Sequence, residues 1–388
     1  MSRSSIRVLY VADTVLPSRR ANTLQSMRLV EALQGCGAEV RFIARSVAAP
    51  TSQIHEHYGI TSTLDVRSAK ISPRFGRSWR LAAFVVREMW HETWDVVHTR
   101  SEKVALCVLL ATRSPVLLEL HNPLRSLLLR RWPTRRGRLR LAAISSELRT
   151  ELSNRTGVDP SEIPLIRSAA ASSSPIEHND RPCAGGATSR RLIAGYAGHL
   201  YPGKGMELLV PIAQRCPEID FVVLGGDQAD IESWRARLGD HQNIDIRGYI
   251  PPSEVAEALR LFDIALLPNQ AVVRPAGSLS GDIGRWTSPL KAFEYLAAGI
   301  AIVASDLPVL REIFVHESTA ILCDPGDPEE WSAAVTRLAA DPELREALGR
   351  RAREEHRLKH SWAARAAEVL EVLEDLVHRT DRESRSRG

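Results

Sequence analysis

Short apolar runs alternate along most of the chain with longer stretches in which apolar residues recur at helical spacing. This alternation is typical of βα repeats, in which each buried strand joins a parallel sheet and is followed by a covering helix. In the first half, strands are predicted at 7–12, 39–44, 96–99, 116–120 and 141–145. In the second half, they are predicted at 192–197, 220–224, 243–247, 264–267, 301–304 and 320–323.

The clearest helix is predicted over residues 22–33, where Leu, Met and Val recur on one face. Asn22 or Thr23 is expected to cap its first turn, and glycines follow its end. Further helices are predicted over 206–216 and from Trp362 to about 378. The charged Ser/Arg tail beyond that last helix is expected to be disordered.

The 388 residues exceed the size, about 250–300 residues, at which one hydrophobic core usually stops growing, so two domains are expected. Between 167 and 190 the pattern gives way to Ser-, Ala-, Pro- and Gly-rich sequence, which is typical of a linker. The predicted fold class is α/β, with two Rossmann-like doubly wound domains facing a central cleft. We expect domains at 1–170 and 191–360, a linker at 171–190, and a helix over 361–380 that packs back onto the first domain.

Basic residues are concentrated in the first part of the chain. Residues 1–150 contain 24 Lys and Arg against 11 Asp and Glu, whereas the whole chain has 51 against 47. Much of this excess lies between Arg125 and Arg140, where arginines are interleaved with Leu and Trp. Such a segment can contact an anionic membrane or an anionic acceptor, although most charge runs are solvated helix faces. Nucleic acid is not indicated as a partner, because aromatic interleaving is sparse and no nucleic-acid motif occurs.

Cysteine spacing and hydropathy exclude other classes. The five cysteines are scattered without a CxxC pair, so neither a zinc site nor a disulfide framework is indicated. No apolar run approaches the roughly 18–20 residues of a membrane span, and the N-terminus does not read as a secretory signal. We therefore expect a cytoplasmic protein, with peripheral contact to the inner face of the membrane as a hypothesis for the Arg125 to Arg140 segment.

Two segments of the second half carry candidate chemistry. The first, at 195–205, lies between a predicted strand and a predicted helix and combines four glycines with Lys204. Glycines at the carboxyl end of a strand let backbone N–H groups approach a phosphate at a helix N-terminus. The alternative is a purely structural turn, because the spacing fits neither GxGxxG nor the P-loop.

The second segment, at 286–308, is a loop that enters a helix. Ser288 is expected to cap this helix and Pro289 to occupy its first turn, which would leave free N–H groups at the start of the helix facing a phosphate. Glu294, one to two turns further on, can accept hydrogen bonds from two vicinal hydroxyls of a ribose or sugar. The alternative is an exposed helix glutamate without a ligand.

Together these segments resemble the retaining glycosyltransferases of family 4, which have the GT-B fold. The resemblance covers nearly the whole chain. Besides 198–205 and 287–308, it rests on 223–227, 246–251 and 263–268, which occur in the family's order and at family-like separations.

The resemblance implies a retaining hexosyl- or N-acetylhexosaminyltransferase that uses a nucleotide-diphosphate sugar and needs neither a metal nor another cofactor. The acceptor would be a hydroxyl of a saccharide, a lipid-linked glycan or a small metabolite. Lys204 would neutralise the diphosphate and Glu294 would bind the ribose, while the backbone at 248–250 would hold the base edge. The other implied donor-binding residues are His199, Gly203, Gly225, Tyr249, Ile250, Asp282, Ser288, Pro289 and Leu290.

The resemblance also assigns residues of the first domain. His121 directly follows a predicted strand, at the position where the family has a histidine that touches the donor sugar. Ala21, Asn22 and Thr23 occupy the place of the family's loop near the sugar and the acceptor. Lys204, Glu294 and His121 would form the catalytic set.

Two departures from the family pattern leave alternatives open. His199 stands where an arginine commonly precedes the phosphate lysine, so part of the phosphate charge would depend on pH. Trp286 stands where the first acid of the Glu-x7-Glu signature would fall, and Asp282 is a speculative substitute. The alternatives are a catalytically silent nucleotide-sugar-binding partner and another GT-B enzyme such as a nucleotide-sugar epimerase.

Overall fold

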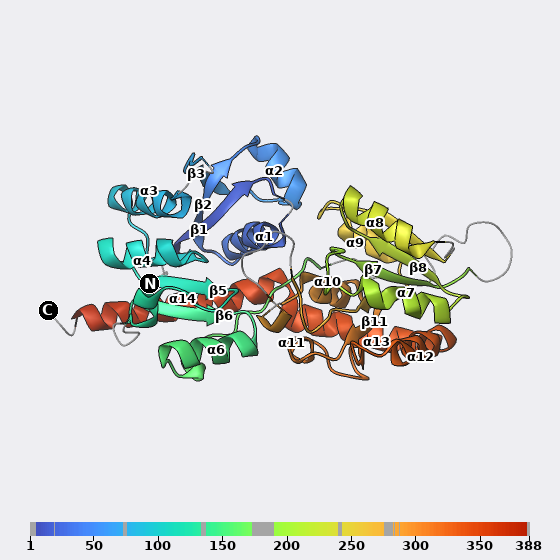
Figure 1. Cartoon of the computed structure of the whole chain (residues 1–388). Coiled ribbons are helices and arrows are strands. Elements are labelled where there is room, and N and C mark those ends of the chain that lie inside the picture. The colour runs from blue at the N-terminus through green and yellow to red at the C-terminus, as the bar shows by residue number, and fades with distance from the viewer. Residues whose placement is uncertain are drawn as a thin grey trace. The chain divides into compact units, whose positions relative to one another are not determined.

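The chain forms two compact units (Figure 1). The computed structural model describes residues 5–18, 20–72, 76–132, 137–172, 190–239, 243–274, 282, 284–286 and 288–385. Unit 1 comprises Met1–Ser168 and Trp362–Gly388, and unit 2 comprises Ala169–Ser361. Most of the predicted linker at 171–190 lies outside the described residues.

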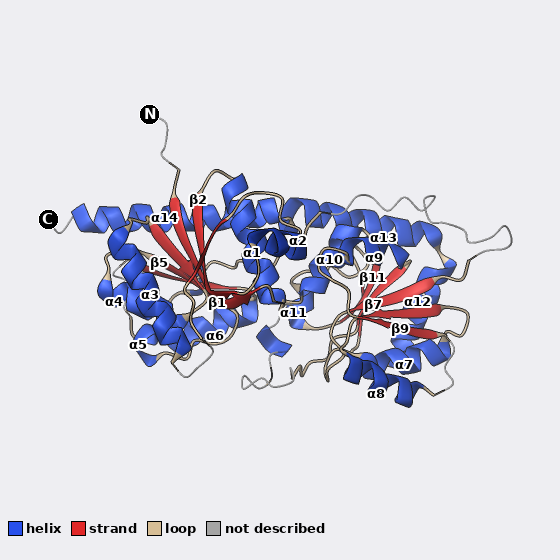
Figure 2. Cartoon of the chain, turned by 90° about the horizontal axis from the view of Figure 1, so that it is seen from above, coloured by secondary structure: helices blue, strands red, loops and turns tan. Residues whose placement is uncertain are grey.

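The described part of unit 1 contains a parallel sheet of six strands in the order β3-β2-β1-β4-β5-β6. Its strands are β1 (Arg7–Leu16), β2 (Glu39–Val47), β3 (Asp65–Ser68), β4 (Val96–Thr99), β5 (Val116–Leu120) and β6 (Leu139–Ala143). Helices cover both faces of this sheet (Figure 2). They are α1 (Ala21–Gly35), α2 (Thr51–Tyr58), α3 (Arg77–His91), α4 (Glu102–Ala111), α5 (Leu127–Arg130), α6 (Ser146–Thr156) and α14 (Trp362–Arg385).

The described part of unit 2 also forms a parallel sheet of six strands, in the order β12-β11-β10-β7-β8-β9. Its strands are β7 (Ile193–Ala197), β8 (Asp220–Leu224), β9 (Ile244–Gly248), β10 (Ile264–Leu267), β11 (Ala301–Ser305) and β12 (Ile321–Cys323). Its helices are α7 (Met206–Arg215), α8 (Gln228–Leu238), α9 (Val255–Ala258), α10 (Leu290–Ala298), α11 (Pro308–Arg311), α12 (Pro328–Ala340) and α13 (Pro342–Glu355).

The two sheets share one topology. In chain order, each places its first strand in the middle, its second and third strands on one side, and its fourth to sixth strands on the other. The order reverses between β1 and β4 in unit 1 and between β7 and β10 in unit 2. In open α/β sheets, ligands bind beyond the carboxyl ends of the strands at such a reversal. Each unit therefore has one preferred edge for a site.

Helix α14 completes unit 1 although it lies at the far end of the chain. Its buried residues Ala366, Val369 and Leu373 belong to the same core cluster as Val8 of β1 and Met27 of α1. These residues recur every three to four positions, which is the spacing of one buried helix face. The core of unit 1 is thus built from segments at both ends of the sequence.

The tail prediction is wrong for the residues that the structure describes, because α14 continues to Arg385. Two features of the extra turns support the helix. Thr380 is buried and donates its hydroxyl to the carbonyl of Leu376 at 2.9 Å. Arg379 pairs with Asp375 one turn earlier at 3.3 Å. A charged composition therefore does not stop a helix that still has a buried face.

Several strand bounds differ from the prediction: β1 and β2 run on to Leu16 and Val47, and β3 and β6 differ in other ways. Strand β3 (Asp65–Ser68) was not predicted, because this edge strand alternates charged and small residues and has no apolar run. Strand β6 begins at Leu139, two residues before the predicted start, and its second residue is Arg140, which the sequence places in the basic segment. Ser145, predicted as the last strand residue, instead caps α6 by accepting the N–H of Leu148.

Candidate functional site

The glycine-rich turn between β7 and α7 is held against neighbouring strand ends. Gly198 donates its N–H to the carbonyl of Leu224, at the end of β8, at 2.8 Å. A Cβ on Gly225, whose φ is +136°, would overlap the carbonyl oxygen of Gly198. Gly203 has φ +89°, and its carbonyl accepts the N–H of Gln270, just beyond β10, at 2.9 Å. The turn therefore sits at the carboxyl edge of the unit 2 sheet.

Three basic side chains gather at this turn. Lys204 Nζ lies 5.6 Å from the centroid of the Tyr201 ring, and the ring of His199 stacks on the same tyrosine at 5.3 Å. Burial lowers the pKa of Lys204 to about 8. Burial, and then the charges of Lys204 and Lys291, lower the pKa of His199. Within the described part of the chain no carboxylate pairs with Lys204, so its charge is left uncompensated there.

Helix α10 presents an ion pair to the same edge. Lys291 Nζ lies 2.5 Å from Glu294 Oε2, and the glutamate side chain is 15% exposed. The hydroxyl of Tyr295 accepts the N–H of Ala197 at 2.7 Å, which fixes α10 to the end of β7. Glu294 is therefore a largely buried carboxylate with one basic partner on its own helix.

The start of α10 differs from the prediction. The helix begins at Leu290, and Pro289 is the N-cap residue, with an extended ψ of 120°. Ser288 does not cap the helix, because it lies one residue before the N-cap position. Its Oγ is buried and finds no hydrogen-bond partner among the described residues. The first N–H groups, at Leu290 and Lys291, thus have no side-chain cap.

The remaining predicted donor residues lie at loops of unit 2. The carbonyl of Gly248 accepts the N–H of Gly225 at 2.6 Å, and Tyr249 beside it is exposed while Ile250 is half-buried. Asp282 Oδ1 accepts two backbone N–H groups, those of Val273 and Gly284, each at 2.8 Å. Asp282 therefore organises its own loop with one oxygen.

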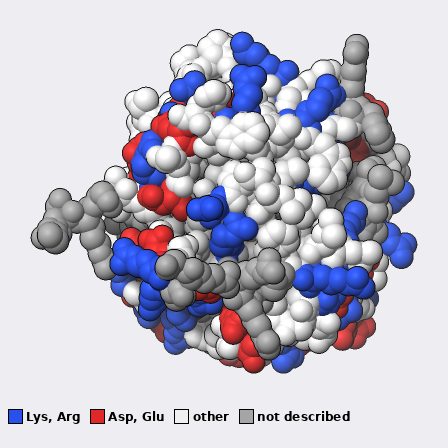
Figure 3. Space-filling model, turned by 90° about the vertical axis from the view of Figure 1, so that its left-hand side faces the viewer, with Lys and Arg blue, Asp and Glu red and all other residues white. Residues whose placement is uncertain are grey.

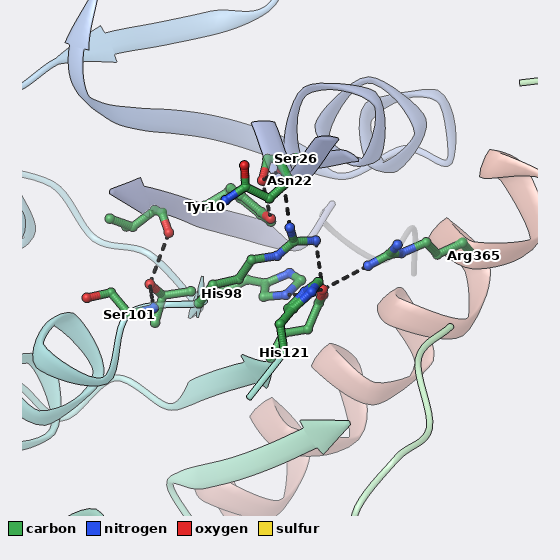
Figure 4. Close-up of polar contacts among 11 residues, drawn as sticks. Tyr10, Asn22, Ser26, His98, Ser101, His121 and Arg365 are labelled. Carbon is green, nitrogen blue, oxygen red and sulfur yellow. Dashed lines mark hydrogen bonds and ion pairs between the residues drawn. The ribbon is translucent and has the colours of Figure 1, made fainter. Parts of the chain in front are cut away.

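In unit 1, the end of β5 carries a buried carboxylate at the centre of four basic side chains (Figure 4). Glu119 Oε1 lies 2.7 Å from Arg100 Nη2, 2.8 Å from His121 Nε2 and 2.9 Å from Arg365 Nη2. Glu119 Oε2 lies 3.2 Å from His98 Nε2. We call these five residues the Glu119 hub.

The side chains of the hub have well-defined protonation states at neutral pH. Burial would raise the pKa of Glu119, but Arg100 and Arg365 lower it well below its ordinary value. Burial, followed by the charge of Arg100, lowers the pKa of His121 to about 4. His98 is fully buried, and burial also lowers its pKa. At neutral pH the hub thus contains a carboxylate, two guanidinium groups and two neutral imidazoles.

The start of α1 connects to this hub. Arg20, not Asn22 or Thr23, is the N-cap residue, and no side chain caps the helix. The Thr23 hydroxyl instead pairs with Thr14 of β1 at 2.8 Å. The carbonyl of Asn22 accepts a hydrogen bond from Arg100 Nη1 at 3.2 Å, while Ala21 and Asn22 are exposed. The capping prediction is wrong because the threonine is drawn into the core.

The basic segment from Arg125 to Arg140 is not one continuous helix face. Its described residues contain only the four-residue helix α5 and the first residues of β6. Arg130 and Arg138 donate to nearby backbone carbonyls, so part of the cluster serves the fold. In the view of Figure 3, basic side chains are dispersed among acidic and uncharged ones rather than gathered in one patch. In the described chain, no helix is both long and apolar enough to cross a bilayer.

Two family models match the chain on either side of the predicted linker. A model described as Glycosyltransferase Family 4 matches residues 25–169, and one described as Glycosyl transferase-like matches residues 205–371. The chain belongs to glycosyltransferase family 4. Its two six-stranded parallel sheets with flanking helices are those of the GT-B fold.

Relatives of this family-4 chain match parts of it. The phosphatidyl-myo-inositol mannosyltransferase of Mycolicibacterium smegmatis is 26% identical over 179 residues, which are 45% of this chain and 42% of that protein. The D-inositol 3-phosphate glycosyltransferase of Segniliparus rotundus is 26% identical over 188 residues, 46% of this chain and 38% of that protein. The match spans less than half the length of either relative.

Solved structures agree with the family-4 chain in fold over nearly its whole length. A glycosyltransferase from Rickettsia africae has a TM-score of 0.71 at 13% identity and covers 96% of this chain and 99% of its own. Anabaena HepE, solved in complex with UDP, has a TM-score of 0.67 at 16% identity and covers 95% and 100%.

Sequence reasoning missed three charged residues of this family-4 chain. Lys291 was read only as part of a motif, although it faces His199 and pairs with Glu294. Glu119 and Arg365 are 246 residues apart, so no local pattern connects them. A buried glutamate inside an otherwise apolar strand was the one available signal, because an unpaired charge at such a position would be costly.

Proposed function

We propose that this protein transfers a sugar from a nucleotide-diphosphate sugar to an acceptor hydroxyl, with retention of anomeric configuration and without a metal. The observation that carries the proposal is the uncompensated charge of Lys204 at the glycine-rich turn, beside His199 and Lys291. A diphosphate would supply the missing negative charge. Fixed positive charge at the leaving group is the largest stabilising factor in many such reactions.

In the proposed unit 2 site, different residues bind the diphosphate, the ribose and the base of the donor. Lys204 neutralises the diphosphate, and the uncapped N–H groups of Leu290 and Lys291 hold its distal phosphate. Glu294 accepts hydrogen bonds from the ribose hydroxyls. The backbone at 248–250, where Tyr249 is exposed, holds the base edge. HepE, whose fold this chain shares, was solved with UDP and with UDP and glucose, which supports a nucleotide-sugar donor.

In the proposed reaction the acceptor oxygen attacks the anomeric carbon from the face that the leaving phosphate vacates. The bond from that carbon to the phosphate oxygen breaks as the new glycosidic bond forms. The departing diphosphate takes the proton of the acceptor hydroxyl, so no protein nucleophile is needed. His121 acts on the transferred sugar, and the start of α1 at Ala21 and Asn22 acts on the sugar or the acceptor.

Calorimetric titration with UDP, GDP and ADP, in buffer containing a chelator, tests this proposal. One of the three is expected to bind, and Lys204→Ala should weaken its binding about 100-fold, which corresponds to about 2.7 kcal/mol. Lys359→Ala is the matched control, because Lys359 is exposed and pairs only with Glu355 among the described residues. If none of the three nucleotides binds, or if binding requires a divalent metal, the proposal is wrong.

A second candidate function rests on position 286. Trp286 stands where the family signature has its first acid. One carboxylate oxygen of Asp282 already accepts the N–H groups of Val273 and Gly284. A chain without that acid can bind a nucleotide sugar as a silent partner in a glycan-assembling complex. Nucleotide binding without release of UDP from UDP-sugars in the presence of acceptors would favour this function.

We also propose that the segment after Arg125 contacts an anionic membrane surface. Leu127 and Leu128 of α5 are 66% and 63% exposed, and Arg125 and Arg131 beside them are exposed as well. Apolar side chains flanked by arginines suit the interface of an anionic bilayer. Co-sedimentation should occur with vesicles containing phosphatidylglycerol, and Leu127→Ser with Leu128→Ser should reduce it. Equal binding to neutral vesicles would contradict this proposal.

A further inference from the structure

The Glu119 hub determines which nitrogen of His121 carries its proton. An ionised carboxylate can only accept hydrogen bonds, and Glu119 is held ionised by Arg100 and Arg365. His121 Nε2 lies 2.8 Å from Glu119 Oε1, so this nitrogen must donate. A neutral imidazole has only one N–H group. His121 Nδ1 is therefore left as an acceptor.

The His121 ring is partly accessible. Its side chain is 26% exposed, and among the described residues its ring makes one hydrogen bond, from Nε2 to Glu119. His98 makes the opposite case, because it is fully buried and its Nδ1 has neither solvent nor a described partner. Two histidines thus donate to one carboxylate, but only His121 can present its second nitrogen to a ligand.

We propose that Glu119 is a positioning residue that fixes His121 as the Nε2–H tautomer, so that Nδ1 accepts a hydrogen bond from a sugar or acceptor hydroxyl. The identity of that hydroxyl rests on the proposed function, whereas the tautomer does not. The proposal explains why a carboxylate lies in a buried strand two residues before His121. An orienting partner of this kind typically fixes both the tautomer and the ring plane of a histidine.

Two arginines from different parts of the chain pair with Glu119. Arg100 follows β4 and also donates to the carbonyl of Asn22, so it links the carboxylate to the start of α1. Arg365 is fully buried on α14 and brings the end of the chain to the same oxygen. Either arginine alone would leave Glu119 paired with a charge. The buried Tyr10 also faces the hub, because its ring lies edge-on to the ring of His98, and its hydroxyl donates to Ser26.

The tautomer can be measured in the free protein. For nuclear magnetic resonance of the protein without ligand, histidines are labelled with ¹⁵N. The His121 signals are assigned by their loss in His121→Asn. At pH 7 the wild-type protein should show a protonated Nε2 and an unprotonated Nδ1. A protonated Nδ1 would overturn the proposal.

A charge-matched double variant tests the role of Glu119. Glu119→Leu with Arg365→Met removes one negative and one positive charge, so the net charge of the buried hub is unchanged. Without the acceptor, both His121 tautomers should become populated. Arg365→Met alone should leave the tautomer as in the wild type, because Arg100 still holds the carboxylate. Glu119→Gln should preserve it in part, since an amide oxygen can still accept from Nε2.

Kinetics separate positioning from structural damage. With UDP-glucose as the donor probe, the double variant should lose about 100-fold in kcat, the size expected for a misplaced catalytic group, with little change in KM. Arg379→Met is the matched control on α14, because Arg379 pairs with Asp375 and not with the hub. Unchanged tautomer and kcat in a folded double variant would overturn the proposal. If the wild type does not turn over a donor, the proposed function fails, while the tautomer still decides the role of Glu119.

Discussion

The two units place clusters of positive charge at equivalent edges of matching sheets, but they balance that charge differently. In unit 1, Arg100 and Arg365 share the built-in carboxylate of Glu119, and all three are largely removed from water. In unit 2, Lys204 has no such partner among the described residues, whereas Lys291 nearby pairs with Glu294 and His199 is kept neutral by its lowered pKa. The unit 1 cluster is complete in the free protein, because its positive charges have a carboxylate partner. The unit 2 cluster is incomplete, because Lys204 has no such partner among the described residues.

This difference indicates a division of work between the units. A buried charge pair is costly to form but very costly to break, so it holds groups in fixed positions. Burial without a charged partner lowers the pKa of Lys204, and a bound anion stabilises its protonated form. The same topology therefore supports a rigid positioning cluster in unit 1 and a binding cluster in unit 2.

The largest expected effect comes from breaking the complete cluster. Glu119→Ala leaves Arg100 and Arg365 buried without their shared carboxylate, which should cost unit 1 about 3–5 kcal/mol of stability. Hydrogen exchange read by mass spectrometry should show faster exchange in β4, β5 and α14 than in the sheet of unit 2. The exposed pair of Arg337 with Glu317 offers a control, because Glu317→Ala should cost less than about 1 kcal/mol. Equal exchange in wild type and Glu119→Ala would show that the hub contributes no stability.

The incomplete cluster should respond to pH. Lys204 has a pKa of about 8 in the free protein, and a bound diphosphate would raise it. Protonated Lys204 is the form that binds the anion, so affinity should fall as pH rises through 8, about tenfold between pH 7 and pH 9. The phosphate itself is already ionised in this range. Calorimetry with the preferred nucleotide diphosphate measures the slope, and Lys204→Arg should flatten it.

His199 extends the pH test in the acidic direction. Its pKa is lowered, so it is neutral at pH 7 and gains a charge only in more acidic solution. His199→Ala should therefore raise the donor KM more at pH 5.5 than at pH 7.5. An unchanged KM at both values would remove His199 from the site.

The sequence predicted the parts of this comparison that depend on local pattern. Strands β4 (Val96–Thr99) and β5 (Val116–Leu120) have the predicted bounds, because each is an apolar run between turns. The glycine-rich turn lies at a strand end as predicted, and its Gly203 and Gly205 have positive φ and close backbone neighbours. Periodicity and turn chemistry are local properties, so they can be read without a fold.

What the sequence did not predict depends on contacts between distant segments. Arg365 meets Glu119 only because α14 packs into the core of unit 1. Lys291 looked like an ordinary helix residue until the structure placed it near His199. The cap predictions at Ser288 and Thr23 also failed, because Pro289 takes the N-cap position of α10 and the hydroxyl of Thr23 bonds to that of Thr14 in the core.

A smaller effect is expected at the ribose. Glu294→Gln keeps one acceptor oxygen and loses one of two proposed hydrogen bonds, which is worth about 1 kcal/mol or a factor of about five. The loss should appear with the ribonucleoside diphosphate and vanish with its 2′-deoxy analogue if the lost bond is to the 2′ hydroxyl. Calorimetry with both nucleotides checks this expectation. An equal loss with both would move Glu294 away from that hydroxyl.

The smallest effect is expected at Asp282. One of its carboxylate oxygens has a structural role, and the other is available for a role in binding. Its Oδ1 accepts the N–H groups of Val273 and Gly284, and an asparagine oxygen can accept both as well. Asp282→Asn should therefore keep the loop and change kcat/KM for the donor by less than about twofold. Asp282→Ala, which removes the acceptor, serves as the loop-breaking comparison. If the asparagine variant lost rate or changed its choice of donor sugar, the second carboxylate oxygen would be reading the sugar, and Asp282 would replace the acid missing at Trp286.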